Sequence, residues 1–190
     1  SNLATAFTGQ LNRAYSLKIN AQGKEYTANT TIPNITKIID SVYWKQAPEY
    51  VPDSLAALMV KATDPPGYGD YVRYYTKDNS EPFYPGINSV FDDQIIDGTT
   101  YSLQVDRGYP RNLGLDKDNL IYFNKGDTVT FKLSNIDKAT FDFWRTMEFS
   151  YSSVGNPFSS PTKVLSNING NALGYFAGYA SQYHTIVIPK

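Results

Sequence analysis

The sequence has no cysteine and a single histidine, His184, among its 190 residues. The lack of cysteine excludes a disulfide framework, thiolate catalysis and cysteine-based zinc sites, and is neutral about the compartment. A Ser-His-Asp relay through His184 would need an exposed nucleophile, but no G-x-S-x-G motif occurs in the chain. We therefore predict a protein that is not an enzyme and that needs no cofactor and no zinc.

Charge is also scarce. The chain carries 17 basic and 18 acidic residues, which leave a net charge of -1. Such a balance gives no basic field to hold a nucleic-acid backbone, so nucleic acid is not an expected partner. The spacing of Gly170, Gly174 and Gly178 fits neither a P-loop nor a dinucleotide-binding loop. No apolar run approaches twenty residues, so we expect a soluble segment whose export signal, if it had one, was removed.

Aromatic residues, in contrast, reach 15% of the chain, with 16 tyrosines. Aromatic side chains favour pleated sheets, and the first half of the chain alternates apolar and polar residues as strands do. The segments AYSLKIN and KEYTANTTI flank the turn Ala21–Gly23 and stop at Pro33, which predicts a β-hairpin over 14–32. A second hairpin is expected from 55–63 and 70–77. Further strand-like runs cover 34–46, 99–106, 128–133 and 184–188.

The segment 137–149 breaks this pattern and is typical of a helix. Asp137 is a suitable N-cap, and Phe141, Trp144 and Met147 share one face, which we expect to cover the open side of a sheet. The fold prediction is a mainly β protein: an antiparallel sandwich or distorted barrel of immunoglobulin-like character, with about seven strands and one helix. We place the domain boundary near Pro33, between a hairpin over 1–33 and a sandwich or barrel over 34–190.

Clustered acidic residues make calcium the metal to consider. Candidate oxygen ligands are Asp116, Asp118 and Asn119, and a second run holds Asp92, Asp93 and Asp97. Neither run completes an EF-hand loop, and acidic residues are common in turns that face water. The calcium hypothesis therefore stays weak.

Exposed aromatic residues can form a stacking platform for sugar rings, and the same residues can instead be core. Tyr74 and Tyr75 are neighbours on an expected strand and must face opposite sides, so at most one of them belongs to the core. The candidate ligand surface consists of Trp44, Tyr74, Tyr75 and Tyr109.

The segment GNPFSSPTKVLSNINGNALGYFAGY, residues 155–179, concentrates turn-forming residues. Its prolines and asparagines set turns, and its glycines permit close backbone approach, so we predict a structural segment that crosses the sandwich in a buried position. The alternative is an open pocket lined by the glycines. The residues that define the segment are Asn156, Pro157, Phe158, Pro161, Asn167, Gly170, Gly174, Phe176 and Gly178.

Several blocks in order give the chain a resemblance to a known family. They are YSLKINAQGKEYTANTTIP, KATDPPGYGDYVRYY, DDQIIDG, FNKGDTVTFKLSNIDKATFDFW and the 155–179 segment. Together they resemble the Bacteroidetes proteins grouped as domain of unknown function 4249. The resemblance implies an exported lipoprotein of the outer membrane, facing the periplasm or the cell surface, with a TonB-dependent transporter as partner.

The chain departs from that family at its start. Family members carry more sequence before the hairpin, which completes a small immunoglobulin-like domain, and a lipid-bearing cysteine; both are absent here. Membrane attachment is thus implied by the family alone. The leading hypothesis is a non-catalytic accessory lipoprotein that assists nutrient uptake. The alternatives are a carbohydrate-binding module and an adhesin-like protein that binds a glycan or peptide ligand, for which an unpaired hairpin edge could recruit a partner strand.

Overall fold

The computed structural model describes residues 7–110, 121–154 and 162–190, and it confirms the predicted fold class. Strands make up 47% of the chain, the sheets are antiparallel, and the described residues form one helix and no closed barrel. The chain forms two compact units, each defined by the contacts among its own residues. The hairpin unit comprises Ser1–Ile35 and Asn135–Ala180, and the sandwich unit comprises Thr36–Ser134 and Ser181–Lys190. The end of the first segment lies close to the predicted boundary at Pro33, whereas the helix and the 162–180 segment belong with the hairpin.

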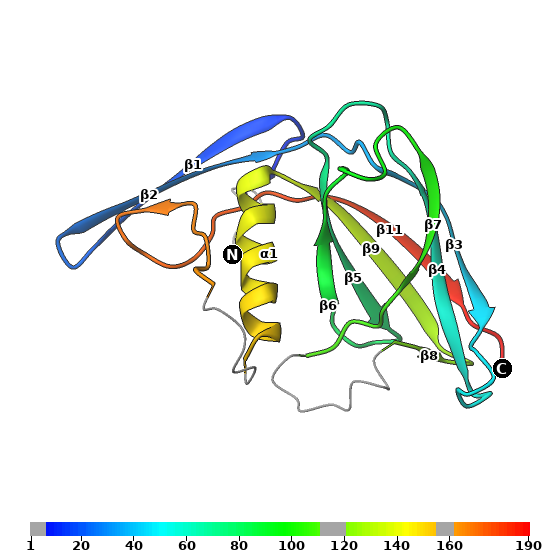
Figure 1. The fold of residues 1–190 in the computed structure, drawn as a ribbon. Coiled ribbons are helices and arrows are strands. Elements are labelled where there is room, and N and C mark those ends of the chain that lie inside the picture. Colours follow the sequence, from blue (N-terminus) through cyan, green and yellow to red (C-terminus); the bar gives the residue numbers. More distant parts are fainter. Residues whose placement is uncertain (1–6, 111–120, 155–161) are drawn as a thin grey trace. The chain divides into compact units, whose positions relative to one another are not determined.

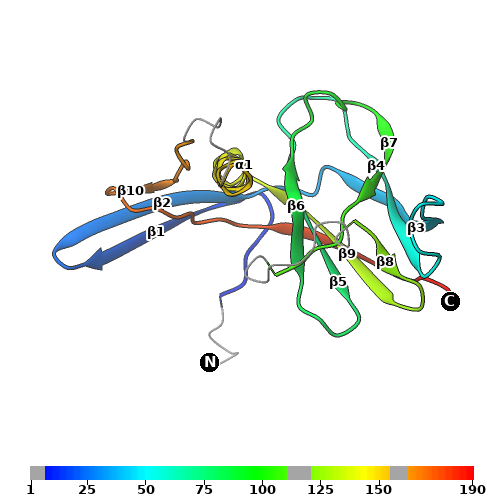
Figure 2. The same cartoon turned by 60° about the horizontal axis from the view of Figure 1, so that its bottom comes forward.

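The sandwich unit contains two four-stranded sheets, which Figures 1 and 2 show as separate layers. One has the strand order β11-β9-β5-β6, and the other has the order β3-β4-β7, with the short strand β8 also paired to β4. The bounds of the first sheet are Ala180–Val187 for β11, Thr128–Ile136 for β9, Tyr71–Asp78 for β5 and Tyr84–Phe91 for β6. Those of the second are Ile38–Gln46 for β3, Leu55–Thr63 for β4, Thr100–Val105 for β7 and Phe123–Asn124 for β8.

The core of the sandwich unit lies between these two sheets. Leu58 and Val60 on β4 belong to the same buried cluster as Val72 and Tyr74 on β5 and Phe131 on β9. Successive side chains of a strand point to opposite faces, so burial of these residues turns their neighbours outward. Each fully buried large apolar side chain contributes roughly 1.5–3 kcal/mol to stability.

The expected second hairpin is wrong. The strands predicted over 55–63 and 70–77 exist as β4 and β5, but they lie in different sheets: β4 pairs with β3, β7 and β8, and β5 pairs with β6 and β9. The segment DPPGYGD between them therefore carries the chain from one sheet to the other. Its two prolines cannot donate to a sheet ladder, and its glycines Gly67 and Gly69 have positive φ, which suits an irregular crossover rather than a hairpin turn.

In the hairpin unit, the predicted hairpin over 14–32 is confirmed. Strand β1, Arg13–Ala21, pairs in register with β2, Lys24–Ile32. Gln22 and Gly23 both have positive φ, as a two-residue turn between right-twisted strands requires. On its other edge β2 pairs with β10, Ile168–Asn169, so among the described strands β2 is the only partner of β1.

The helix α1 spans Lys138–Ser152, and Asp137 is its N-cap as predicted. Asp137 Oδ1 accepts a hydrogen bond from the Thr140 N–H at 2.9 Å. Its Oδ2 accepts from the Thr30 hydroxyl at 2.7 Å and from the Thr31 N–H at 3.1 Å. One carboxylate thus caps the helix and joins it to β2.

The predicted face of α1 is confirmed only in part. Phe141 and Phe143 are buried, whereas Met147 is 37% exposed. Trp144 donates from Nε1 to the Tyr179 hydroxyl at 3.0 Å and meets the Tyr175 ring edge-on at 4.9 Å. The helix therefore packs against the 162–180 segment within the hairpin unit through Trp144, and Met147 is the exposed member of the three predicted residues.

Replacing Asp137 by alanine is expected to destabilise the protein by about 2–4 kcal/mol, since it removes the helix cap and two bonds to β2. Asp137→Asn should lose less, because its carbonyl oxygen can still accept from Thr140. Urea unfolding followed by circular dichroism measures the difference. The matched control is Asp142→Ala, which removes only a surface pair with Lys138 and should change stability by about 0.5 kcal/mol or less. Equal losses for Asp137→Ala and Asp142→Ala would contradict the double role of Asp137.

Candidate functional site

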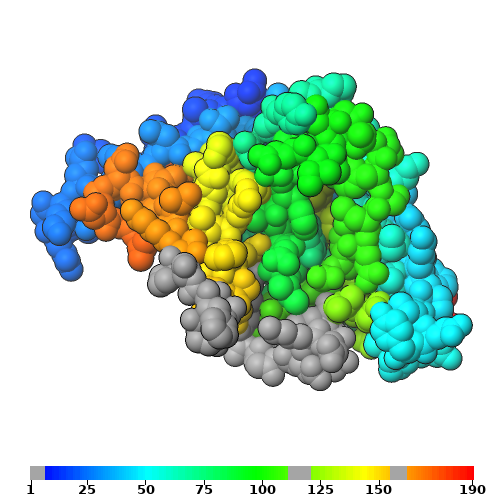
Figure 3. Space-filling model, in the orientation of Figure 1, coloured from blue at the N-terminus to red at the C-terminus, as the bar shows by residue number. Residues whose placement is uncertain are grey.

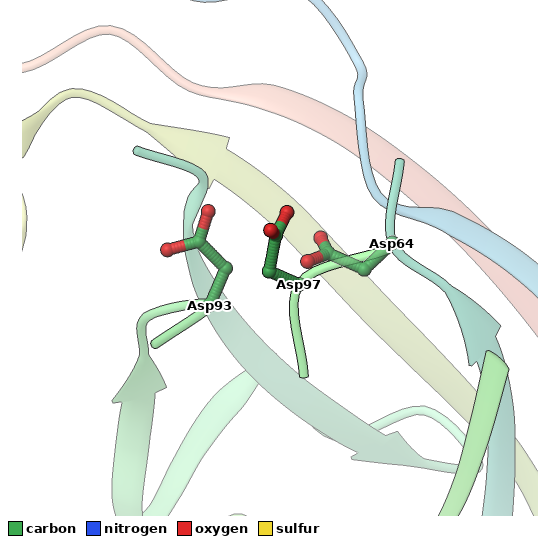
Figure 4. A group of neighbouring side chains, drawn as sticks. All are labelled: Asp64, Asp93 and Asp97. Carbon is green, nitrogen blue, oxygen red and sulfur yellow. The ribbon is translucent and has the colours of Figure 1, made fainter. Parts of the chain in front are cut away.

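Three carboxylates gather where the β4–β5 crossover meets the segment after β6. One oxygen each from Asp64, Asp93 and Asp97 lies within 4.8 Å of the other two, and the first two residues are buried. Figure 4 shows the Asp64 carboxylate pointing toward that of Asp97. Oxygen donors at such spacing suit a hard divalent cation. Sequence reasoning named Asp93 and Asp97 as candidates but missed Asp64, which the fold brings to them from another segment.

Two of these carboxylates hold the crossover loop. Asp93 Oδ2 accepts from the N–H groups of Gly69 and Asp70, at 2.7 and 2.9 Å. Asp97 Oδ1 accepts from the Gly67 N–H at 2.6 Å. The loop that carries the chain between the two sheets is therefore fixed by acidic side chains from the DDQIIDG block.

The third carboxylate is paired with a buried lysine. Lys37 Nζ lies 3.3 Å from Asp64 Oδ1, and both side chains are fully buried. Neither group has a hydrogen bond within the described residues. Burial raises the pKa of Asp64, and the Lys37 ammonium partly opposes that rise. Because Lys37 supplies the compensating positive charge and the other carboxylates bind backbone amides, we assign this cluster a structural role.

A second group of side chains lies on the outer face of the other sheet. Lys132 Nζ stands 4.8 Å from the ring centroid of Tyr75 and 5.8 Å from those of Phe83 and Tyr183. Lys77 Nζ lies 5.7 Å from the Phe83 centroid. These five residues, Tyr75, Lys77, Phe83, Lys132 and Tyr183, form what we call the tyrosine–lysine face.

The tyrosine–lysine face is partly exposed, and its two cations have no acidic partner among the described residues. Tyr183 is 56% exposed, and Phe83 lies against it with ring centroids 5.8 Å apart. Within the described part of the chain, neither the Lys77 nor the Lys132 ammonium forms an ion pair. Their contacts are with ring faces, which attract a cation but are weak acceptors for its N–H groups. Beside them, the hydroxyls of Thr130 and Thr185 lie 2.9 Å apart.

Of the aromatic residues predicted as a ligand surface, Tyr75 belongs to this face. Tyr74 is buried at 4% exposure and stacks on Phe131, so the structure removes it from the surface. Trp44 is on β3 in the other sheet and is 37% exposed. Tyr109 follows β7 and donates its N–H to the Pro85 carbonyl at 3.4 Å. Sequence reasoning missed Tyr183. The pattern that could have found it is the alternation along β11, in which Tyr183 and Thr185 are exposed and the residue directly after the strand, Ile188, is buried on the opposite face.

The described part of the 155–179 segment is held together by its own polar side chains. Asn167 donates to the Phe176 carbonyl at 2.7 Å and accepts from the Phe176 N–H at 2.9 Å. Gly170 has φ +97°, and a Cβ there would lie 2.8 Å from the Glu25 carbonyl oxygen. A Cβ at Gly178 would overlap the Ile32 side chain. Glycine is therefore required at positions 170 and 178 for the segment to lie along β2.

The sequence predicted a buried crossing of the sandwich, but the described part of this segment, 162–179, does not form one. It belongs to the hairpin unit, and most of 162–175 is exposed. Figure 3 shows it in orange on the surface beside the yellow helix α1. Residues 163–166 and 168–173, with Gly170 among them, line an open pocket of about 450 Å³. The short strand β10 explains the difference, because it pairs with the edge of β2 and leaves its other side to solvent.

Other predicted residues fall outside the described ranges. They are the calcium candidates Asp116, Asp118 and Asn119, and Asn156, Pro157, Phe158 and Pro161 of the structural segment. His184 is described and half-buried on β11; no hydrogen bond joins its ring to another described side chain.

Comparison with known proteins decides the family. The sequence matches the family described as Domain of unknown function (DUF4249) over residues 1–185. The chain belongs to this family. No curated protein and no solved structure matches the chain. Within the described residues of this DUF4249 protein, no helix combines the length and the hydrophobicity needed to span a membrane.

Lys37→Met tests the structural role of the acidic cluster. The variant leaves Asp64 buried without its cation, so we expect a loss of about 3–5 kcal/mol at pH 7 in urea unfolding. Lys61→Met, at an exposed position on β4, is the matched control and should change stability by about 0.5 kcal/mol or less.

The deficit of Lys37→Met should also depend on pH. Burial raises the pKa of Asp64 in the folded state above its ordinary value of 3.8, so protonation of Asp64 favours the folded state. The stability difference between wild type and Lys37→Met should therefore shrink as the pH falls from 7 through the raised pKa toward 3.8. A deficit that grows on acidification, or a Lys37→Met variant as stable as Lys61→Met at pH 7, would contradict this assignment.

Proposed function

We propose that this protein is a non-catalytic accessory lipoprotein of the bacterial outer membrane that captures a nutrient for a TonB-dependent transporter. The observation that carries the proposal is the tyrosine–lysine face of the sandwich unit. It offers the exposed ring of Tyr183 and two ammonium groups that have no acidic partner among the described residues, which suit reversible binding of a ligand.

Two further features support a binding role over a chemical one. The buried carboxylates that resemble a catalytic or metal-binding group are bound to the amides of Gly67, Gly69 and Asp70 and to Lys37. The ring of His184 has no hydrogen bond to a described serine or carboxylate that could complete a relay. Family membership supports the cellular location, because the resemblance implies exported lipoproteins that act with outer-membrane transporters.

A second candidate function, adhesin-like strand addition, is favoured by the free edge of the hairpin. Strand β1 pairs only with β2 among the described strands, so its outer edge presents backbone groups that a partner strand could pair with. The surface ion pair of Lys18 and Glu25 spans the two strands near the turn and makes this end of the hairpin polar. We rank this function second because backbone hydrogen bonds at a strand edge do not indicate which partner would bind.

The leading proposal predicts a transporter complex. The tagged full-length lipoprotein, purified from outer membranes in mild detergent, should recover a TonB-dependent transporter in roughly equal amount, identified by mass spectrometry. An unrelated outer-membrane lipoprotein with the same tag, purified in parallel, is the control. Recovery of no transporter, under conditions in which other outer-membrane complexes stay intact, would overturn the proposed partnership.

A further inference from the structure

We infer that the tyrosine–lysine face binds an acidic glycan, in which a sugar ring stacks on Tyr183 and its carboxylate is bound by Lys132 and Lys77. This inference deepens the proposed function, on which it rests in treating ligand capture as the task of the protein. It names the class of ligand and the residues that recognise it.

The charge of the ligand follows from Lys132. Its ammonium is surrounded by three rings at 4.8 to 5.8 Å, yet it has no carboxylate partner among the described residues. Ring faces attract the positive charge, but they are much weaker hydrogen-bond acceptors for the three N–H groups than a carboxylate is. A lysine that is partly shielded from water and whose N–H groups meet only ring faces within the described residues is a site for an anionic acceptor, because charge-assisted hydrogen bonds are stronger than contacts with a ring.

Lys77 extends the positive site along the same sheet. Its ammonium lies 5.7 Å from the Phe83 centroid, and Lys132 lies 5.8 Å from the same centroid. The two cations thus flank one ring, and neither has an acidic partner within the described residues. Two unneutralised ammonium groups on one face are complementary to a ligand that carries repeated carboxylates.

The sugar character of the ligand follows from the surroundings of these cations. Tyr183 presents a ring that is 56% exposed, and the apolar face of a pyranose can stack on such a ring. Thr130 is two residues from Lys132 on β9, and Thr185 is two residues from Tyr183 on β11. Their hydroxyls offer hydrogen-bonding groups to sugar hydroxyls. A uronic acid carries an apolar ring face, hydroxyls and a carboxylate. The tyrosine ring, the threonine hydroxyls and the lysine ammonium groups are complementary to these three groups in turn.

The test is isothermal titration calorimetry of the full 190-residue chain with defined probes. The acidic probes are tetramers of galacturonate and of mannuronate; the neutral probes are tetramers of galactose and of mannose. A tetraglutamate peptide carries the charge without a sugar ring. We expect saturable binding of at least one uronate tetramer, weakened by added salt, and at least about tenfold weaker binding of its neutral counterpart and of tetraglutamate.

Variants locate the site. Lys132→Met keeps most of the side-chain length but removes the charge, and Tyr183→Ala removes the stacking ring; each should weaken binding of the uronate tetramer by about tenfold or more. The matched control is Lys45→Met. Lys45 also lies over a tyrosine ring, 5.9 Å from the Tyr43 centroid, but on β3 in the other sheet, so its loss should leave binding unchanged. Unchanged circular dichroism and thermal unfolding show that each variant is folded.

Three results would overturn the inference. Absence of binding to both uronate tetramers excludes an acidic glycan, equal binding of neutral sugar or tetraglutamate excludes the ligand class, and full binding by a folded Lys132→Met variant excludes the site. No transporter takes part in these titrations. Uronate binding without transporter capture would therefore contradict only the partnership, and transporter capture without uronate binding would contradict only the ligand class.

Discussion

Packing between the two sheets of the sandwich unit is the constraint on which the candidate ligand site depends. Tyr74 is buried there and stacks on Phe131 with ring centroids 5.8 Å apart. Because side chains alternate along a strand, burial of Tyr74 turns Tyr75 and Lys77 to the outer face of the same strand. Burial of Phe131 does the same for Lys132 on the neighbouring strand. Packing of the core therefore determines which side chains lie on the tyrosine–lysine face.

Three aspartates of the chain hold backbone segments in place. Asp93 and Asp97 bind the amides of the β4–β5 crossover, and Asp137 binds the first turn of α1 and the Thr31 amide of β2. Carboxylates that accept from several N–H groups fix segments that have no sheet partner of their own. Lys37 completes this arrangement by compensating the buried charge of Asp64. The described cluster of Asp64, Asp93 and Asp97 therefore explains the crossover loop better than it explains a metal site.

Local patterns predicted most of the elements, and the errors have two causes: residues with poor strand propensity and long-range strand pairing. The hairpin over 14–32, the strand over 55–63 and the Asp137 cap follow from alternation, turn residues and capping chemistry, all of which act over a few residues. The strand β6 was missed because Pro85 and Gly86 are poor strand formers. Pairing of β4 with β5 was wrong because sequence neighbours need not share a sheet.

The candidate site shows the same limit. Tyr75 could be named from its strand, but Lys132 and Tyr183 join it only when β9 and β11 pair beside β5. Likewise Asp64 and Lys37 lie on segments far from the acidic run that the sequence pointed to. The alternation of apolar and polar residues along a strand predicts which face of the sheet each side chain lies on. It does not predict which side chains of other strands lie beside it.

The tyrosine–lysine face combines the exposed ring of Tyr183 with two cations that lack acidic partners in the described structure. The most direct test of its role is NMR of the chain with ¹³C-labelled lysines, titrated with a galacturonate or mannuronate tetramer. The account predicts that the Cε–Hε signals of Lys77 and Lys132 shift with saturation, whereas the signal of Lys45 stays in place. Saturable shifts centred on Lys45 or on other lysines, or no shifts with either tetramer, would contradict it.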